Sequence, residues 1–183
     1  MAQIESNMME LGTKAPEFSL PDVVSGKTVT LSEIKSNIAT VVVFICNHCP
    51  FVKHINLKLV EVANKYRAKD VQFIAISSND VDTYPQDGPS FMKQIAEDNY
   101  YPFPYLYDST QEVAKAYQAE CTPDFFMFDG DLKCVYRGQF DETRPNKGEA
   151  SGKDISAALD AIIANKKVSD VQKPSIGCNI KWK

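Results

Sequence analysis

The sequence lacks the features expected of a membrane, secreted or nucleic-acid-binding protein. It has no apolar run near the ~18 residues that a membrane-spanning helix requires. The first eight residues, MAQIESNM, have no basic start, apolar middle or small-residue cleavage site, so we expect no signal peptide and a cytoplasmic location. A formal net charge of −4, with nothing that supplies a basic face, argues against nucleic acid as a partner.

Internal repeats and low-complexity tracts are also absent. The length of 183 residues fits one domain over the whole chain, and a hydrophobic content of 44% is enough for a substantial core. We expect residues 1–14 to be a loosely held N-terminal segment and residues 166–183 to be a C-terminal tail. The oligomeric state is left open.

Cysteines are few, and their number is odd. Five cysteines cannot all be paired, and thiols in a chain without a secretory signal stay reduced unless they do redox work. Cys46 and Cys49 have the spacing Cys-x-x-Cys, and no second such pair exists. His54 would lie ~12 Å from Cys46 along a helix, so a four-ligand zinc site is disfavoured. A metal-carrying or binding module remains an alternative, but no metal or other cofactor is expected.

The order of apolar patterns predicts an α/β fold. The almost wholly apolar run at 38–45 is typical of a central strand buried on both faces. A strand pair precedes it and an alternation of helices and strands follows, which predicts a central mixed sheet flanked by helices with an N-terminal β-hairpin extension. The expected elements are a strand pair within 18–31, helices near 51–66, 88–96, 109–117 and 155–163, and strands at 71–76, 125–128 and 134–136.

Cys46 stands where the predicted central strand ends and a helix begins. The unpaired N–H groups of a helix N-terminus stabilise a thiolate, so we expect Cys46 to be exposed in the first turn with a lowered pKa. Cys49, three residues on, would share its helical face and resolve a mixed disulfide formed by Cys46. Protonated His48 would stabilise the thiolate and make the pair a stronger oxidant; the alternative is a polar loop residue.

Two further motifs carry a family resemblance. Residues 15–20, Ala-Pro-Glu-Phe-Ser-Leu, look like an N-terminal strand signature, and Thr122-Pro123 looks like a Thr-Pro that precedes a strand. With Cys-x-x-Cys, they resemble the thioredoxin-like superfamily and its redoxin or peroxiredoxin-like branch, of the AhpC/TSA type, over roughly residues 12–165. The resemblance implies a thioredoxin-like fold, a cis Pro123, and a Thr122 that packs against the sulfurs and forms part of the substrate-binding edge.

Departures from the family patterns narrow the expected activity. Peroxidatic members carry Pro-x-x-x-Thr/Ser-x-x-Cys, but Ala39 and Val43 stand at those positions here. Thioredoxin has Trp before its first cysteine and a buried Asp six residues ahead of it, where this chain has Ile45 and Thr40. Dithiol–disulfide exchange is therefore favoured, and a thiol peroxidase with Cys46 as the peroxidatic residue, which would have an antioxidant role, is the alternative.

The expected function is that of an oxidoreductase that exchanges disulfides with a protein partner and is served by an unidentified electron donor. Cys121 and Cys178 are possible third thiols; Cys121 is alternatively a small buried apolar residue. Four residues are expected to tune the thiol pKa values or contact the substrate: Asn47, His48, Thr122 and Pro123.

Overall fold

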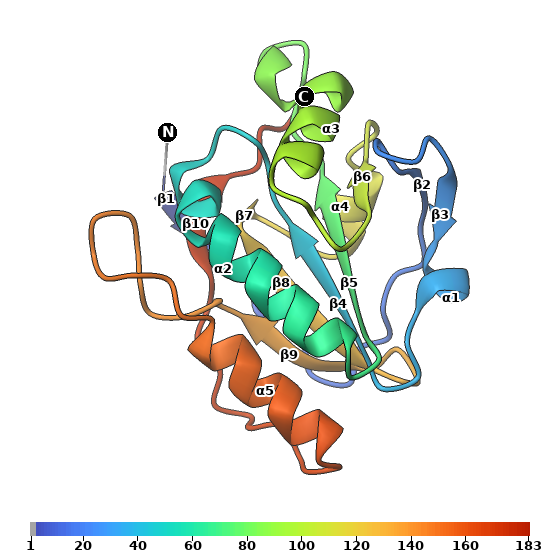
Figure 1. Ribbon diagram of the computed structural model, residues 1–183, viewed down its shortest axis with the longest axis vertical. Coiled ribbons are helices and arrows are strands. Elements are labelled where there is room, and N and C mark those ends of the chain that lie inside the picture. The colour runs from blue at the N-terminus through green and yellow to red at the C-terminus, as the bar shows by residue number, and fades with distance from the viewer. Residues whose placement is uncertain (1–2) are drawn as a thin grey trace.

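A five-stranded mixed sheet forms the centre of the computed structural model, which describes residues 3–183 (Figure 1). The strand order is β6-β5-β4-β8-β9; β4 pairs in parallel with β5 and antiparallel with β8. All six residues of β4 are buried, as its apolar run predicted. The bounds are β4 Ala39–Phe44, β5 Val71–Ser77, β6 Tyr105–Tyr107, β8 Asp124–Asp129 and β9 Cys134–Gly138.

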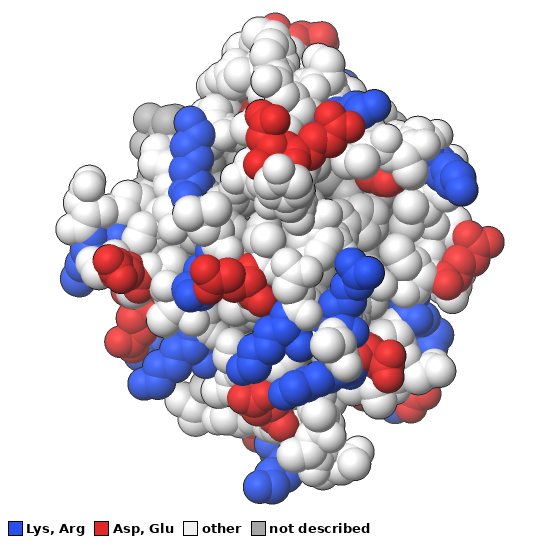
Figure 2. All heavy atoms as spheres, viewed as in Figure 1, with Lys and Arg blue, Asp and Glu red and all other residues white. Residues whose placement is uncertain are grey.

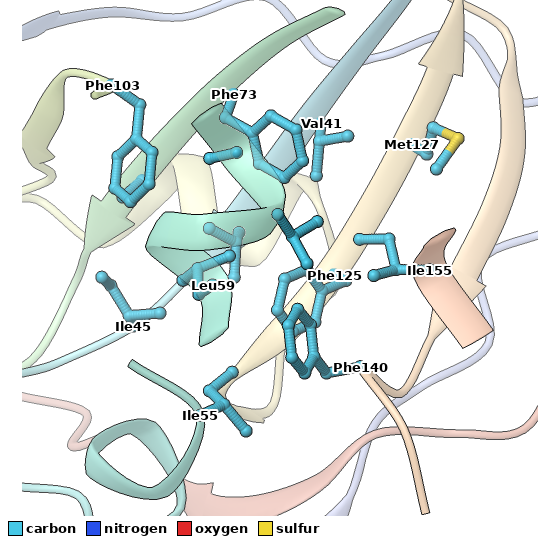
Figure 3. Close-up of a cluster of buried hydrophobic side chains, with 14 of the residues drawn as sticks. Val41, Ile45, Ile55, Leu59, Phe73, Phe103, Phe125, Met127, Phe140 and Ile155 are labelled. Atoms are coloured by element: carbon cyan, nitrogen blue, oxygen red, sulfur yellow. The ribbon is translucent and has the colours of Figure 1, made fainter. Parts of the chain in front are cut away.

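Helices cover both faces of this sheet, as expected. In Figure 1, α2 (Pro50–Arg67) and α5 (Lys153–Ile163) lie in front of the strands, and the short α4 (Glu112–Ala116) lies behind them. Alternate residues of β4 therefore enter two cores, Val41 on the α2 side and Val42 on the α4 side. Figure 3 shows the first core, in which side chains from α2, α5 and the sheet meet, among them Leu59, Phe125 and Ile155.

Several smaller elements complete the main layers. β2 (Ser19–Pro21) and β3 (Thr28–Thr30) form the expected N-terminal hairpin, as a sheet of their own followed by α1 (Leu31–Ile34). α3 (Pro89–Asp98) follows the short 3-10 helix η1 (Pro85–Asp87) and inserts Met92 and Ala96 into the first core. The thioredoxin-like α/β architecture is thus confirmed, with β6 as a strand that was not predicted.

The two ends of the chain, in which no strands were predicted, form a second sheet with β7. β10 (Ile176–Asn179) lies between β1 (Gln3–Glu5) and β7 (Cys121–Thr122) and pairs antiparallel with both (Figure 1). Met9 and Ile180 are buried in the core on the α4 side. Strands this short show no periodicity in the sequence, so neither the strands nor their pairing could be predicted from it. Residues 1–2 of the predicted N-terminal segment lie outside the described residues.

Acidic and basic side chains are intermixed on the face drawn in Figure 2, and neither sign covers it. This distribution agrees with the modest net charge of −4. Between residues 3 and 183, no helix has both the length and the apolar character needed to cross a membrane.

Candidate active site

The two cysteines of the motif lie in the loop between the central strand and α2. β4 ends at Phe44 and α2 begins at Pro50, so Cys49 is the residue before the helix and Cys46 lies three residues earlier, in the loop. A residue that precedes proline is driven to extended backbone, and Cys49 has φ −66° and ψ 123°. Cys46 is 2% exposed. The expectation that Cys46 is exposed in the first helical turn is therefore wrong.

Thr122 contacts both sulfurs. Its hydroxyl oxygen lies 3.5 Å from Cys46 Sγ, and its carbonyl oxygen accepts a hydrogen bond from Cys49 Sγ at 3.2 Å. The peptide bond between Thr122 and Pro123 is cis. The cis proline and the packing of Thr122 on the thiols, both implied by the resemblance, are confirmed.

The backbone of Thr122 is paired within the chain. Thr122 lies opposite Cys178 in the antiparallel ladder of β7 and β10, and Cys121 lies opposite Asn179. The strand edge that we expected to bind an extended substrate is therefore occupied by the C-terminal strand in this structure.

A third thiol adjoins the pair. Cys178, on β10, is 4% exposed and lies in the same buried cluster as Cys46 and Cys49. Its interaction with Cys49 is the largest cause that raises the pKa of Cys178. All five cysteines are free thiols. The other candidate, Cys121, points elsewhere, since its Sγ donates to the carbonyl oxygen of Pro123 at 3.6 Å. Burial raises the pKa of the Cys121 thiol. Of the two possible third thiols, the structure brings Cys178 to the motif.

A buried carboxylate that sequence reasoning missed lies beside His48. Asp87 Oδ2 is 2.5 Å from His48 Nδ1 and accepts a hydrogen bond from Asn79 Nδ2 at 2.8 Å. Asp87 Oδ1 accepts from the backbone N–H groups of Asn47 and His48 at 2.8 and 3.2 Å. The imidazole ring also stacks on Tyr84, with ring centroids 5.4 Å apart. His48 is thus held in place, and Asp87 would offset its charge when it is protonated.

Asn47 shapes the loop and makes no hydrogen bond to the sulfurs. Its side-chain Nδ2 donates to the carbonyl oxygen of Gln86 at 2.9 Å, and its Oδ1 accepts from the Tyr105 hydroxyl at 3.1 Å. These bonds fasten the motif to η1 and to β6.

The electrostatics of the three thiols differ from the sequence-based expectation. The pKa of Cys46 is raised, by its hydrogen bond to Cys49, by burial and by the negative charge of Asp87, while the Thr122 hydroxyl acts in the opposite direction. Hydrogen bonds from Cys178 and Cys46 lower the pKa of Cys49. A sulfur flanked by two S–H donors is the position where one negative charge is best stabilised. Among the three thiols, these interactions therefore favour the charged form at Cys49 and the neutral form at Cys46 and Cys178.

One group of potential metal ligands lies in this region. Ligand atoms of Cys46, His48 and Asp87 are all within 4.8 Å of one another, and no other such group occurs within residues 3–183. Zinc takes about four ligands, and both carboxylate oxygens of Asp87 already accept hydrogen bonds. The donor set therefore suits hydrogen bonding better than metal binding.

A small surface hollow lies next to the cis proline. It combines apolar side chains from α2 with polar ones from the loop after β9, and β10 closes one side. Its lining residues are Phe51, His54, Ile55, Pro123, Gln139, Phe140, Asp141, Thr143, Arg144, Ser175 and Ile176.

Comparison with known proteins places this site in a family. The model of the AhpC/TSA family matches residues 11–137. The solved structure of an uncharacterized conserved protein from Geobacillus kaustophilus is 59% identical, with a TM-score of 0.98 over 100% of this chain and 97% of that one. A hypothetical protein from Sinorhizobium meliloti 1021 is 45% identical, with a TM-score of 0.95 over 98% of each chain.

A more distant structure shares the fold. A putative thioredoxin from Neisseria meningitidis is 24% identical, with a TM-score of 0.66 over 86% of this chain and 95% of that one. A search of curated proteins found no match.

Proposed function

Because the chain belongs to the AhpC/TSA family and has a thioredoxin-like fold, we propose that it is a thiol–disulfide oxidoreductase that exchanges disulfides with protein partners through Cys46 and Cys49. The family and the fold support a redox enzyme in general. The observation that supports this reaction is the pair of adjacent free thiols held on the hydroxyl and carbonyl oxygens of Thr122.

The reaction is a pair of exchanges. The Cys46 thiolate attacks one sulfur of the partner's disulfide, the S–S bond of the partner breaks, and the departing thiolate takes up a proton. Cys49 then attacks Cys46 Sγ, which releases the second partner sulfur and leaves a Cys46–Cys49 disulfide. Two electrons have passed from the dithiol to the partner. A separate dithiol donor must return them, and the reverse sequence oxidises a dithiol partner.

Hydrogen bonding prepares Cys49 for the second exchange. The hydrogen bond from Cys178, the largest cause that lowers the pKa of Cys49, is still available when Cys46 is in a mixed disulfide, so it favours the nucleophilic thiolate of Cys49 at that point. Cys46 must be activated when a partner binds, because it is covered and its pKa is raised in the closed loop. The hollow beside Pro123 offers a partner chain a contact surface next to the motif.

Peroxide chemistry is less well supported. The positions that carry the fixed turn and the hydroxyl in peroxidatic members are Ala39 and Val43, which are buried residues of β4. The hydroxyl that contacts Cys46 comes instead from Thr122, which precedes the cis proline. Reduction of protein disulfides therefore accounts better for these residues.

The test is a trapping experiment. In a Cys49→Ser variant the second exchange is blocked, so we expect mixed disulfides between Cys46 and partner proteins, released by dithiothreitol, to accumulate. The matched control is Cys134→Ser, which removes another buried cysteine, on β9, and should trap nothing. A Cys46→Ser variant should abolish the adducts.

Two other outcomes would overturn the proposal. Absence of adducts in Cys49→Ser, with rapid loss of the Cys46 thiol at micromolar peroxide, would identify a peroxidase. Metal bound stoichiometrically to protein purified under reducing conditions, and lost in Asp87→Asn, would identify a metal carrier.

A further inference from the structure

The C-terminal strand delivers a thiol to the buried side of the motif. β10 is paired on both edges, with β1 and with β7, so Cys178 lies in the middle strand, opposite Gln3 on one edge and Thr122 on the other. It lies directly opposite Thr122, the residue whose carbonyl oxygen is 3.2 Å from Cys49 Sγ. Cys178, Cys49 and Cys46 all belong to one buried cluster, with Cys49 as the shared hydrogen-bond partner.

The fit of β10 against the active-site loop is tight. A Cβ placed on Gly177 would lie 2.0 Å from the carbonyl oxygen of Thr122 and 2.7 Å from its carbonyl carbon. Real Cβ atoms do not approach so closely, so only glycine lets β10 reach this position. The neighbouring Cys178 is therefore brought to the motif by a backbone contact that depends on Gly177.

The tail is also connected to the polar side of the motif. The backbone N–H of Lys181 donates to Asn79 Oδ1 at 2.9 Å, and Asn79 Nδ2 donates to Asp87, the carboxylate that holds His48. The tail therefore contacts both the thiols and the residues that position the loop.

We propose that Cys178 is a third redox-active residue, which attacks Cys49 in the Cys46–Cys49 disulfide and transfers the bond to Cys49–Cys178. This inference rests on the proposed function, because it needs the Cys46–Cys49 disulfide as its starting point. The Cys178 sulfur bonds to Cys49 Sγ, the Cys46–Cys49 bond breaks, and the proton from Cys178 passes to Cys46. No electrons leave the protein, so no oxidant or reductant is needed for this step.

The consequence is an oxidised protein in which Cys46 is a free thiol. The disulfide then joins Cys49 to Cys178, and Cys46 is again free to attack the disulfide of a partner protein. In the reduced protein, the hydrogen bond to Cys49 and burial raise the pKa of Cys178. Once Cys49 is part of a disulfide it carries no charge, so its contribution to the raised pKa of Cys178 is lost. The positive charge of Lys181 continues to favour the Cys178 thiolate.

Peptide mapping separates a Cys46–Cys49 disulfide from a disulfide to Cys178, and the position of the alkylated cysteine within residues 36–53 shows which of the two is bonded to Cys178. Trypsin leaves Cys46 and Cys49 together in residues 36–53, and Cys178 in residues 168–181, because it does not cleave between Lys173 and Pro174. A Cys46–Cys49 bond therefore stays within one peptide, whereas a bond to Cys178 joins two. Cys121 lies in residues 116–133 and serves as an internal control.

The decisive experiment uses folded Cys46→Ser protein, oxidised with diamide, quenched in acid, alkylated and digested. We expect the peptides 36–53 and 168–181 to be joined, and 116–133 to remain alkylated at Cys121. In oxidised wild type, a fraction of molecules should carry the same cross-link with Cys46 alkylated. That fraction should be lost in Cys178→Ser, whose Cys46–Cys49 disulfide still forms.

The outcomes separate this inference from the proposed function. If Cys46→Ser keeps both Cys49 and Cys178 alkylatable while wild type forms the Cys46–Cys49 disulfide, the role of Cys178 is refuted and the proposed function stands. If neither wild type nor Cys178→Ser forms a Cys46–Cys49 disulfide, the proposed function itself fails. Circular dichroism of each variant checks that the fold is retained.

Discussion

Asp87 Oδ2 lies 2.5 Å from His48 Nδ1, and the carboxylate is completely buried between the motif and Asn79. This relationship changes the role expected of His48. A protonated imidazole would favour the Cys46 thiolate, but the adjacent carboxylate opposes it, and its charge is one of the causes that raise the pKa of Cys46. The hydrogen bond to Cys49 and burial are the larger causes, and the charge of Asp87 adds to them in favouring the thiol form of Cys46.

Replacing Asp87 with Asn should therefore activate Cys46. Removal of the negative charge lowers the pKa of the thiol, so its alkylation at pH 7 should accelerate. We expect the alkylation rate to rise roughly threefold for each unit by which the pKa falls, since the larger thiolate population is partly offset by weaker nucleophilicity. The rate is measured in a Cys49→Ser background by iodoacetamide labelling between pH 6 and 10, with mass spectrometry of the peptide 36–53.

The control for this charge effect is Asp82→Asn, which removes an exposed acid a few residues away. It should leave the alkylation profile unchanged. An unshifted or raised pKa of Cys46 in folded Asp87→Asn would show that the carboxylate does not hold the thiol in its protonated form.

Thr122→Val should have the opposite effect. The Thr122 hydroxyl, 3.5 Å from Cys46 Sγ, lowers the pKa of the thiol, so its loss should raise that pKa. In the same Cys49→Ser background, alkylation at pH 7 should slow by roughly threefold for each unit of increase. The control is Thr122→Ser, which retains a hydroxyl and should stay close to the parent. Equal rates for the Val and Ser variants would contradict a role for this hydrogen bond.

Most of the central architecture could be predicted from the sequence, because it depends on local patterns. A strand with both faces buried, such as 39–44, and a long amphipathic helix, such as 50–67, each show several periods of their apolar repeat. β6, β7 and β10 have two to four residues and show no full pattern. Their formation depends on partners that are distant in the sequence, as in the pairing of Gln3 with Cys178.

The candidate site likewise has a part that could be predicted from the sequence and a part that could not. Cys46, Cys49, Thr122 and Pro123 belong to motifs that are visible in the sequence, and the structure brings them together. The contribution of Asp87 could not be predicted, because an acid in a polar turn gives no signal of burial until η1 folds against the motif. The depth of Cys46 was also unpredictable, since it depends on how the loop packs beneath Thr122.

Asp124 should make stability fall as the pH rises. Its carboxylate is buried at the start of β8, Oδ1 has no hydrogen-bond partner among residues 3–183, and burial raises its pKa well above the ordinary value. The folded protein therefore retains a proton that the unfolded chain releases above about pH 4. Its contribution to stability is complete below that pH and is lost as the pH rises towards the folded-state pKa.

An Asp124→Asn variant cannot ionise and should remove this effect. We expect it to be more stable than wild type at pH 7 by about 1–3 kcal/mol, with a smaller difference at pH 4.5. Urea unfolding midpoints at the two pH values measure this, and Asp131→Asn, at the exposed turn after β8, is the control. A difference that does not change with pH would mean that folding does not raise the pKa of Asp124.

Gly177→Ala should disturb the contact between the C-terminal strand and the motif. The new Cβ would lie 2.0 Å from the Thr122 carbonyl oxygen, so β10 has to move away, at a cost of about 1–3 kcal/mol in the free energy of unfolding. The shift also moves Cys178 away from Cys49, so Cys178 should be alkylated faster in the folded variant.

Gly26→Ala is the control, because its Cβ meets no atom within 4 Å and the loss of stability comes only from a φ of +71°. Gly26→Ala should lower stability by about 1 kcal/mol and leave the Cys178 alkylation rate unchanged. A Gly177→Ala protein with wild-type stability and an equally protected Cys178 would show that β10 is not pressed against the active-site loop in solution.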